Sequence, residues 1–294
     1  MIVRSAQTPR MAATPDERPT EDQGWTGGQT AVTADLLGNA LPGPLCPAVS
    51  STHVVLIPSF NSGALLAATV ASARKYWAPV WVIIDGSTDG SAAAIEMMTQ
   101  RDPRLRILHL PVNSGKGAAV RIGLAAAQSD GFTHALVMDA DGQHPADRIP
   151  AFMSTSISAP DSLVMGRPIF GADAPRARVL GRRLCNACAV LETMRPVGDT
   201  LFGFRVYPVG ALLSIMQQSR GMNRFDFDPE AVVRLVWQDL KLIHLPTPVR
   251  YLSQAEGGVS HFSYLRDNLL LIGMHLRLSL AAIRRLALRR RRYR

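Results

Sequence analysis

The sequence predicts an α/β fold in which a mostly parallel sheet is covered by helices on both faces. From residue 53 onward, short β-branched apolar runs alternate with segments of helical periodicity. Each run is apolar at consecutive positions, which is typical of strands buried on both faces. Strands and helices that alternate over short links indicate a parallel sheet.

The first half of this pattern is regular. Four apolar runs are predicted as strands, at residues 53–58, 80–84, 105–110 and 134–138. Three helices are predicted between them, at residues 63–77, 92–100 and 115–128. Asp89 or Ser91 could cap the second of these helices.

The pattern becomes less regular after Pro150. Further strands are predicted at residues 162–167, 203–208, 240–245 and 249–252. Two further helices are predicted at residues 177–194 and 229–238.

The two ends of the chain differ from this central part. Residues 1–50 are rich in Thr, Ala, Gly and Pro and show no sustained periodicity, so we expect a disordered leader. We expect one globular domain at residues 51–262, and a basic amphipathic helix with a tail at residues 263–294. The net charge of +9 concentrates in that tail, whose final stretch, IRRLALRRRRYR, contains seven arginines and no acid.

Composition excludes several classes of protein. No run reaches the roughly 18 apolar residues of a membrane span. Cys185 and Cys188 form a C-x-x-C pattern inside a predicted helix, where two small side chains packed on the helix are favoured over a metal or redox site. Sparse cysteine also suggests a reducing compartment. Tyr293 is the one aromatic residue of the basic tail, which argues against nucleic-acid binding.

Polar clusters follow each of the first four predicted strands. Their sequences are SFNSG, DGSTDGS, NSGKG and DADGQH. Ligands of parallel sheets bind beyond the carboxyl ends of the strands. The four loops therefore predict a single site.

Asp139 and Asp141 are the most informative pair in these loops. Residues two apart on an extended strand end point the same way, so both carboxylates can meet at one point while Ala140 turns elsewhere. Each charge would raise the pKa of the other carboxyl, and a divalent cation would remove that penalty. Mg²⁺ or Mn²⁺ completed by substrate phosphates suits this arrangement, and Gln143 offers a further oxygen.

Simple turns and two known phosphate-binding loops are the alternatives for these segments. An isolated D-x-D is more often a turn, but this pair closes a buried strand among three other polar loops. Lys116 is followed by Gly117 and Ala118, so NSGKG is not a P-loop, although it lies at a helix N-terminus that favours phosphate. DGSTDGS does not match the dinucleotide G-x-G-x-x-G pattern either.

On these residues, the chain resembles a family 2 glycosyltransferase with the GT-A fold, which is a Rossmann-like, mostly parallel sheet. The pattern is most similar to the branch that transfers sugars to dolichyl or polyprenyl phosphate. The resemblance runs from about Val54 to His261 and rests on an ordered set of motifs: IPSFN, IIDGSTDGS, NSGKGAAVRIG, MDADGQHP, MGR and GFRVYP.

The resemblance implies roles for particular residues. It implies a nucleotide-sugar donor whose base and ribose contact Pro58, Phe60, Asn61 and Asp85, with Lys116 and Asp139 close by. It implies that Asp139, Asp141 and Gln143 hold Mg²⁺ or Mn²⁺ against the donor diphosphate. Donor or acceptor phosphate is expected at Arg167, at Arg182 or Arg183, at Arg205 together with Asp199, and at His261.

Two positions depart from the family pattern. Ser62 stands where the family usually has an acid, and Ile84 replaces the first of two paired aspartates. Both positions are expected in the nucleotide pocket, so the choice between UDP and GDP stays open.

The acceptor decides whether a base is needed. A hydroxyl acceptor would require a general base, for which Asp226, Asp228 and Glu230 are candidates. Asp228 and Glu230 could instead cap the start of the helix that Pro229 begins and match its charge. A lipid phosphate arrives anionic and needs no base.

The C-terminal helix fits a lipid acceptor. Leu269, Ile272, Leu276, Leu280 and Ile283 recur at helical spacing, with arginines away from that row. A basic amphipathic helix of this kind can lie on an anionic membrane. We therefore expect a cytoplasmic protein held peripherally at the inner face of the cell membrane. The alternative is a helix packed on its own domain with a basic tail.

Two other functions compete with glycosyl transfer. A sugar nucleotidyltransferase would need Arg and Lys in a glycine-rich loop after the first strand, and PSFNSGALL has neither. A catalytically impaired nucleotide-sugar-binding protein is suggested by Ser62 and Ile84.

Overall fold

The computed structural model describes residues 47–170, 176–249 and 263–292 of the chain. His261 and the predicted strand beyond Val249 lie outside these residues. Ala48 and Val49, which were expected in the leader, form strand β1 (Ala48–Val49) and pair with β3 (Trp77–Ala78).

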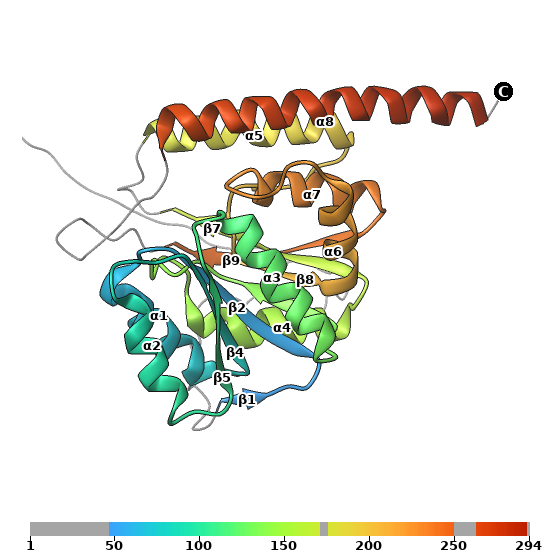
Figure 1. The fold of residues 1–294 in the computed structure, drawn as a ribbon. Helices are drawn as coiled ribbons and strands as arrows, with labels where there is room; N and C mark the ends of the chain where they lie inside the picture. Colours follow the sequence, from blue (N-terminus) through green and yellow to red (C-terminus); the bar gives the residue numbers. More distant parts are fainter. Residues whose placement is uncertain (1–46, 171–175, 250–262, 293–294) are drawn as a thin grey trace, which may run out of the picture. The chain divides into compact units, whose positions relative to one another are not determined.

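A seven-stranded sheet forms the centre of the fold (Figure 1). Its order is β5-β4-β2-β6-β8-β7-β9. The parallel half contains β2 (His53–Ser59), β4 (Val80–Asp85), β5 (Leu105–Leu110) and β6 (His134–Val137). The other half contains β7 (Ser162–Ile169), β8 (Arg205–Pro208) and β9 (Lys241–Pro248), and there β8 runs antiparallel to both neighbours. The predicted α/β fold with a mostly parallel sheet is confirmed.

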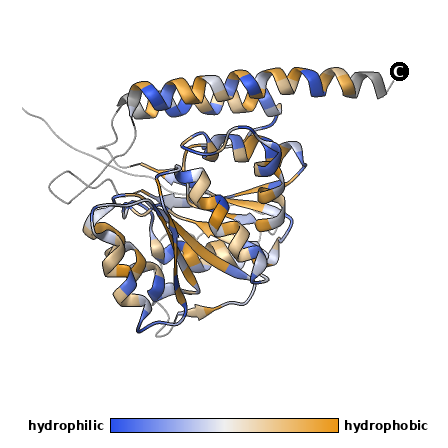
Figure 2. Cartoon of the chain, viewed as in Figure 1, coloured by the Kyte–Doolittle hydropathy of each residue, from blue (hydrophilic) through white to orange (hydrophobic). Residues whose placement is uncertain are grey.

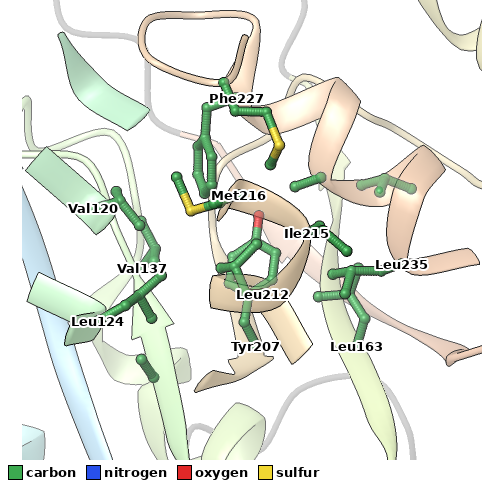
Figure 3. Close-up of a cluster of buried hydrophobic side chains, with 14 of the residues drawn as sticks. Val120, Leu124, Val137, Leu163, Tyr207, Leu212, Ile215, Met216, Phe227 and Leu235 are labelled. Atoms are coloured by element: carbon green, nitrogen blue, oxygen red, sulfur yellow. The ribbon is translucent and has the colours of Figure 1, made fainter. Parts of the chain in front are cut away.

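Helices cover both faces of the sheet, and each face has its own core. One core is formed with α1 (Gly63–Tyr76), α2 (Ser91–Thr99) and α4 (Ile149–Ser158). The other is formed with α3 (Lys116–Ser129), α6 (Val209–Gln218) and α7 (Phe227–Trp237). Figure 3 shows part of this second core, where Tyr207 and Leu163 of the sheet meet Leu212, Phe227 and Leu235 of the helices. Figure 2 shows that the central strands are mostly hydrophobic.

Two long helices form a further layer over α7. These are α5 (Arg176–Thr193) and α8 (Tyr264–Arg292), which lie side by side (Figure 1). Met274, Leu278 and Ala282 of α8 are buried. His275 links the two helices, because Nδ1 lies 2.9 Å from Glu192 Oε1 and Nε2 lies 3.1 Å from Cys185 Sγ. Over the residues described, no helix combines the length and the apolar character needed to cross a bilayer.

Candidate active site

A cavity of about 1040 Å³ opens at the carboxyl edge of the parallel strands. All four predicted polar loops contribute to it. Their lining residues are Pro58, Ser59, Phe60, Ser62, Asp85, Asn113, Gly115, Lys116, Asp139, Ala140, Asp141 and Gln143. The convergence expected from the end of each strand is therefore present.

Asp139 and Asp141 both line this cavity, although not for the reason expected. Strand β6 ends at Val137, so the pair does not lie on an extended strand end. The chain turns instead at Gly142, whose φ is 73°, and the backbone N–H of Gln143 donates to Asp141 Oδ1 at 3.0 Å. A glycine tolerates this left-handed conformation without strain. The turn brings both carboxyls to the same cavity.

The pKa values of the two aspartates differ because their surroundings differ. Burial alone would raise the pKa of Asp139, but the adjacent Lys116 ammonium outweighs it and lowers this pKa to about 2. Burial, together with the charge of Asp139, raises the pKa of Asp141 to about 6. The cavity thus holds one well-compensated carboxylate and one that lacks a cation.

His144 holds the acidic loop in place. The backbone N–H of Asp139 donates to His144 Nδ1 at 2.9 Å, which leaves the ring proton on Nε2. Burial lowers the pKa of His144 to about 4, so the ring is neutral near pH 7. The ring also packs against Phe202 and Phe204. No role was predicted for this histidine from the sequence, although it follows the acidic pair closely.

Lys116 joins the acidic loop to Asp228. Its Nζ lies 2.7 Å from Asp139 Oδ1 and 2.7 Å from Asp228 Oδ2. Asp228 also lines the cavity, and its buried Oδ1 has no hydrogen-bond partner among the described residues. Arg205 carries a further cation near this oxygen, with Nη1 4.0 Å away.

Arg205 is buried behind Asp228 and does not line the cavity. Its side chain is fully buried, and Nη1 donates to the backbone carbonyl of Asp228 at 2.7 Å and to the Tyr207 hydroxyl at 3.1 Å. The direct phosphate or acceptor contact expected of Arg205 is therefore corrected, because no surface of the side chain is accessible.

Glu230 does not reach the cavity either. Its carboxylate is fully buried, accepts hydrogen bonds from Ser219 Oγ and Arg234 Nε, and pairs with Arg277 Nη2 of α8 at 3.1 Å. The expected role as a general base is corrected. Glu230 ties α7 to α8 and matches the charge of the first turn of α7.

Two residues that were expected to contact the nucleotide, Asp85 and Asn61, accept hydrogen bonds from backbone N–H groups of neighbouring loops. The Asp85 carboxylate accepts hydrogen bonds from the backbone N–H groups of Ser114 and Gly115, at 2.7 and 2.8 Å. Asn61 does not line the cavity, and its Oδ1 accepts from the N–H of Thr88. Ile84 was expected in the nucleotide pocket. It is 2% exposed and lies in the apolar core instead.

Arginines line the side of the cavity next to α5 and α8. Arg182, as expected, is one of them, and its Nη1 lies 2.8 Å from Asp199 Oδ1. Arg183 and Arg167 are exposed and do not line it, so the phosphate contact expected of Arg167 stays a prediction. Arg224 and Arg266 do line the cavity, although neither was predicted there from the sequence.

The residues of the cavity suit a divalent ion shared with a ligand. Asp139, Asp141 and Gln143 offer hard oxygen donors, and the raised pKa of Asp141 shows that its negative charge lacks compensation. No group of three or more His, Cys, Asp or Glu side chains in the described parts of the chain could enclose a metal. The oxygen donors of Asp139, Asp141 and Gln143 are of the kind that Mg²⁺ and Mn²⁺ prefer, with phosphate oxygens completing the coordination.

Comparison with known proteins agrees with this geometry. A family model described as glycosyl transferase family 2 matches residues 54–212. A polyprenol monophosphomannose synthase from Mycolicibacterium smegmatis is 23% identical over 216 residues, which cover 71% of this chain and 80% of the relative.

Two solved structures share the fold. One is glucosyl-3-phosphoglycerate synthase from Mycobacterium tuberculosis in complex with Mn²⁺, UDP-glucose and phosphoglyceric acid, with a TM-score of 0.50 and 18% identity over 79% of this chain and 78% of that one. The other is the mannosyltransferase PcManGT from Pyrobaculum calidifontis in complex with GDP-Man and Mn²⁺, with a TM-score of 0.51 and 18% identity over 83% of this chain and 68% of that one. The predicted GT-A arrangement is confirmed.

Proposed function

This chain belongs to glycosyl transferase family 2 and is a glycosyltransferase of the GT-A fold, and we propose that it transfers a sugar from UDP or GDP to a polyprenyl phosphate or another lipid-linked acceptor. The reaction proceeds with inversion at the anomeric carbon. The carboxylate pair Asp139 and Asp141, placed together in a large cavity at the carboxyl edge of the sheet, is the observation that carries this proposal.

The acidic pair is proposed to bind the donor diphosphate through a metal. Asp139, Asp141 and Gln143 would hold Mg²⁺ or Mn²⁺, and the two solved structures bound to Mn²⁺ and a nucleotide sugar support this. When bound, the ion neutralises the charge that develops on the leaving nucleoside diphosphate. His144 keeps the acidic loop in its conformation through the N–H of Asp139.

The loops after β2 and β4 are proposed to bind the nucleoside. Pro58 and Phe60 present an apolar surface to the cavity, next to Asp85. Ser62 also lines the cavity, and its Oγ lies 2.9 Å from Ser59 Oγ. A neutral residue at this position leaves both UDP and GDP as candidates.

The surroundings of Asp228 favour a phosphate acceptor over a hydroxyl. Asp228 Oδ2 already accepts a hydrogen bond from Lys116, and the other carboxylate oxygen, Oδ1, is buried and so is not presented to a hydroxyl in the cavity. A lipid phosphate is anionic before it reacts and needs no base. Arg182, Arg224 and Arg266 would hold it at the cavity. The polyprenol-linked activity in the name of the mycobacterial relative agrees with this acceptor class.

The outer face of α5 and α8 is proposed to lie on an anionic membrane. Large apolar side chains stand 57–77% exposed along this face: Leu180, Leu184, Leu191, Leu265, Leu269, Ile272, Leu276, Leu280 and Ile283. The acids of these helices, Glu192 and Asp267, are both buried. An apolar row flanked by arginines and lacking exposed acids suits the surface of a bilayer. We assign the inner face of the cell membrane.

A transfer assay tests the proposal. Full-length protein is incubated with UDP- and GDP-sugars, vesicles that contain polyprenyl phosphate, and Mn²⁺, Mg²⁺ or EDTA. We expect one sugar to appear on the lipid only with metal, with its anomeric configuration inverted by NMR. Metal-independent donor binding without transfer would instead favour the impaired binding protein.

A further inference from the structure

Lys116 occupies a position where a cation is normally unfavourable. It is the first residue of α3, where the helix dipole repels positive charge and no acid lies in the first turn. Its side chain is also only 13% exposed, so burial further disfavours the ammonium. Both effects must be offset by specific partners, and these are the carboxylates of Asp139 and Asp228.

Glycines create the space in which this ammonium lies. A Cβ at Gly203 would lie 2.6 Å from Lys116 Nζ. A Cβ at Gly117 would lie 2.1 Å from the Met222 carbonyl oxygen, so this glycine lets the start of α3 approach the loop before α7. The N–H of Ala118 donates to the Asn223 carbonyl at the same contact. The Lys116 site is thus defined by backbone packing as well as by charge.

The ammonium changes what the acidic pair offers to a divalent ion. Asp139 Oδ1 is already taken by Lys116 at 2.7 Å. Asp141 Oδ1 accepts the N–H of Gln143. A divalent ion beside Asp139 would also be repelled by the ammonium on the same carboxylate. The two aspartates therefore present less uncompensated negative charge than their number suggests.

We propose that Lys116 is an internal counter-ion of Asp139, so that the divalent ion binds tightly only together with the donor diphosphate. This inference rests on the proposed function, since it presupposes the metal and the diphosphate. The donor diphosphate brings negative charge that replaces the Asp139 charge neutralised by Lys116. The Lys116 ammonium can also pair with the diphosphate. Coupling of this kind is reciprocal, so metal and nucleotide each strengthen the binding of the other.

Direct Mn²⁺ binding tests the proposal without relying on activity. Free Mn²⁺ is followed by electron paramagnetic resonance in the wild type, in Lys116→Met, and in Lys75→Met as the matched control, because Lys75 is exposed on α1. Without nucleotide, we expect Lys116→Met to bind Mn²⁺ at least about tenfold more tightly than the wild type. Lys75→Met should match the wild type. UDP or GDP should raise the Mn²⁺ affinity of the wild type more than that of Lys116→Met.

A second variant guards against misfolding. Lys116→Met removes the ammonium from Asp139 and from the buried carboxylate of Asp228. The double variant Lys116→Met/Asp228→Asn, which removes the pair without changing net charge, is therefore measured as well. The same gain in Mn²⁺ affinity is expected.

The possible failures can be told apart. If the wild type binds Mn²⁺ with nucleotide but neither variant gains affinity without it, Lys116 is not the counter-ion and the proposed function stands. If the wild type binds no Mn²⁺ even with both nucleotides, the metal assignment and this inference are overturned together.

Discussion

Asp139 and Asp141 are two positions apart, yet the structure gives them different electrostatic partners. Lys116 neutralises Asp139, whereas Asp141 has a backbone N–H and, among the described residues, no paired cation. We therefore expect Asp141 to contribute most of the negative charge that a divalent ion would meet.

Replacement of Asp141 tests this assignment. Asp141→Ala should lower the rate of sugar transfer by at least about 100-fold, because the ion that stabilises the leaving group would lose its least compensated ligand. Steady-state transfer with saturating Mn²⁺ measures the effect. Asp130→Asn is the control, since Asp130 lies at the exposed end of α3, paired with Arg106. Turnover retained in Asp141→Ala would refute the metal assignment.

Metal binding should depend on pH through the same residue. The pKa of Asp141 is raised to about 6, so without metal this carboxyl is largely protonated below pH 6 and ionised above it. A proton and a metal compete for it. Mn²⁺ affinity in the presence of a UDP- or GDP-sugar, whose diphosphate has no terminal phosphate that titrates near pH 6, should be level above about pH 7 and fall up to tenfold per pH unit below about pH 6. Asp141→Asn should lose this step, and an unchanged step in that variant would assign it to another group.

Some site residues could be predicted from the sequence and others could not. Asp139 and Asp141 follow a buried strand directly, which is a local signal. The pairing of Lys116 with Asp228 joins residues far apart in the sequence, so no spacing rule shows it. Different roles for Glu230 and Asp228 could have been predicted from the sequence, because residues two apart on a helix do not share a face. Since Asp228 faces the cavity, Glu230 turns toward α8.

At the scale of elements, the strands and helices predicted within the described residues are present, but helices α4 and α6, which the structure also describes, were not predicted. The pattern becomes less regular after Pro150 and no helix was predicted there, yet this proline lies in the first turn of α4, where its missing N–H is harmless. Helix α6 directly follows β8, and Leu212, Leu213 and Ile215 are among its buried residues. Its buried positions Val209, Leu212, Leu213 and Met216 recur at helical spacing, so this helix could have been predicted from the sequence.

The α7–α8 contact is expected to be structural. Glu230→Gln should lower the free energy of unfolding by about 2 kcal/mol, because the buried carboxylate loses charge-assisted hydrogen bonds to Arg234 and Arg277. Transfer per folded molecule should stay within a few-fold of the wild type. Urea denaturation and initial rates measure the two quantities. A severe loss of rate at unchanged stability would restore Glu230 as a base.

The exposed apolar row on α5 and α8 should determine membrane binding. We expect the triple variant Leu184→Asn/Leu269→Asn/Leu276→Asn to bind anionic vesicles at least about tenfold more weakly. The reason is that three exposed leucine side chains would no longer be transferred from water into the membrane. Co-sedimentation measures binding. Ile122→Asn/Ile157→Asn is the control, since both side chains are exposed on other helices. A membrane role for this row would be contradicted if the triple variant bound vesicles as tightly as the wild type. It would also be contradicted if the wild type formed a dimer and the triple variant did not.

At the scale of the whole molecule, four strand ends and two added helices meet at one cavity. The strands supply the carboxylates and the loops, whereas α5 and α8 supply Arg182, Arg266 and the exposed leucines beside them. The alternation of strands and helices predicts the first part. The second part depends on how two distant helices pack over α7, which no local pattern encodes.

Diffraction from crystals soaked with Mn²⁺ and UDP or GDP tests the central claim most directly. The carboxylates of Asp139 and Asp141 should lie beside an anomalous peak at the manganese edge, with nucleotide phosphates completing its coordination. Nucleotide density in the cavity with no anomalous signal next to these oxygens would contradict a shared metal site.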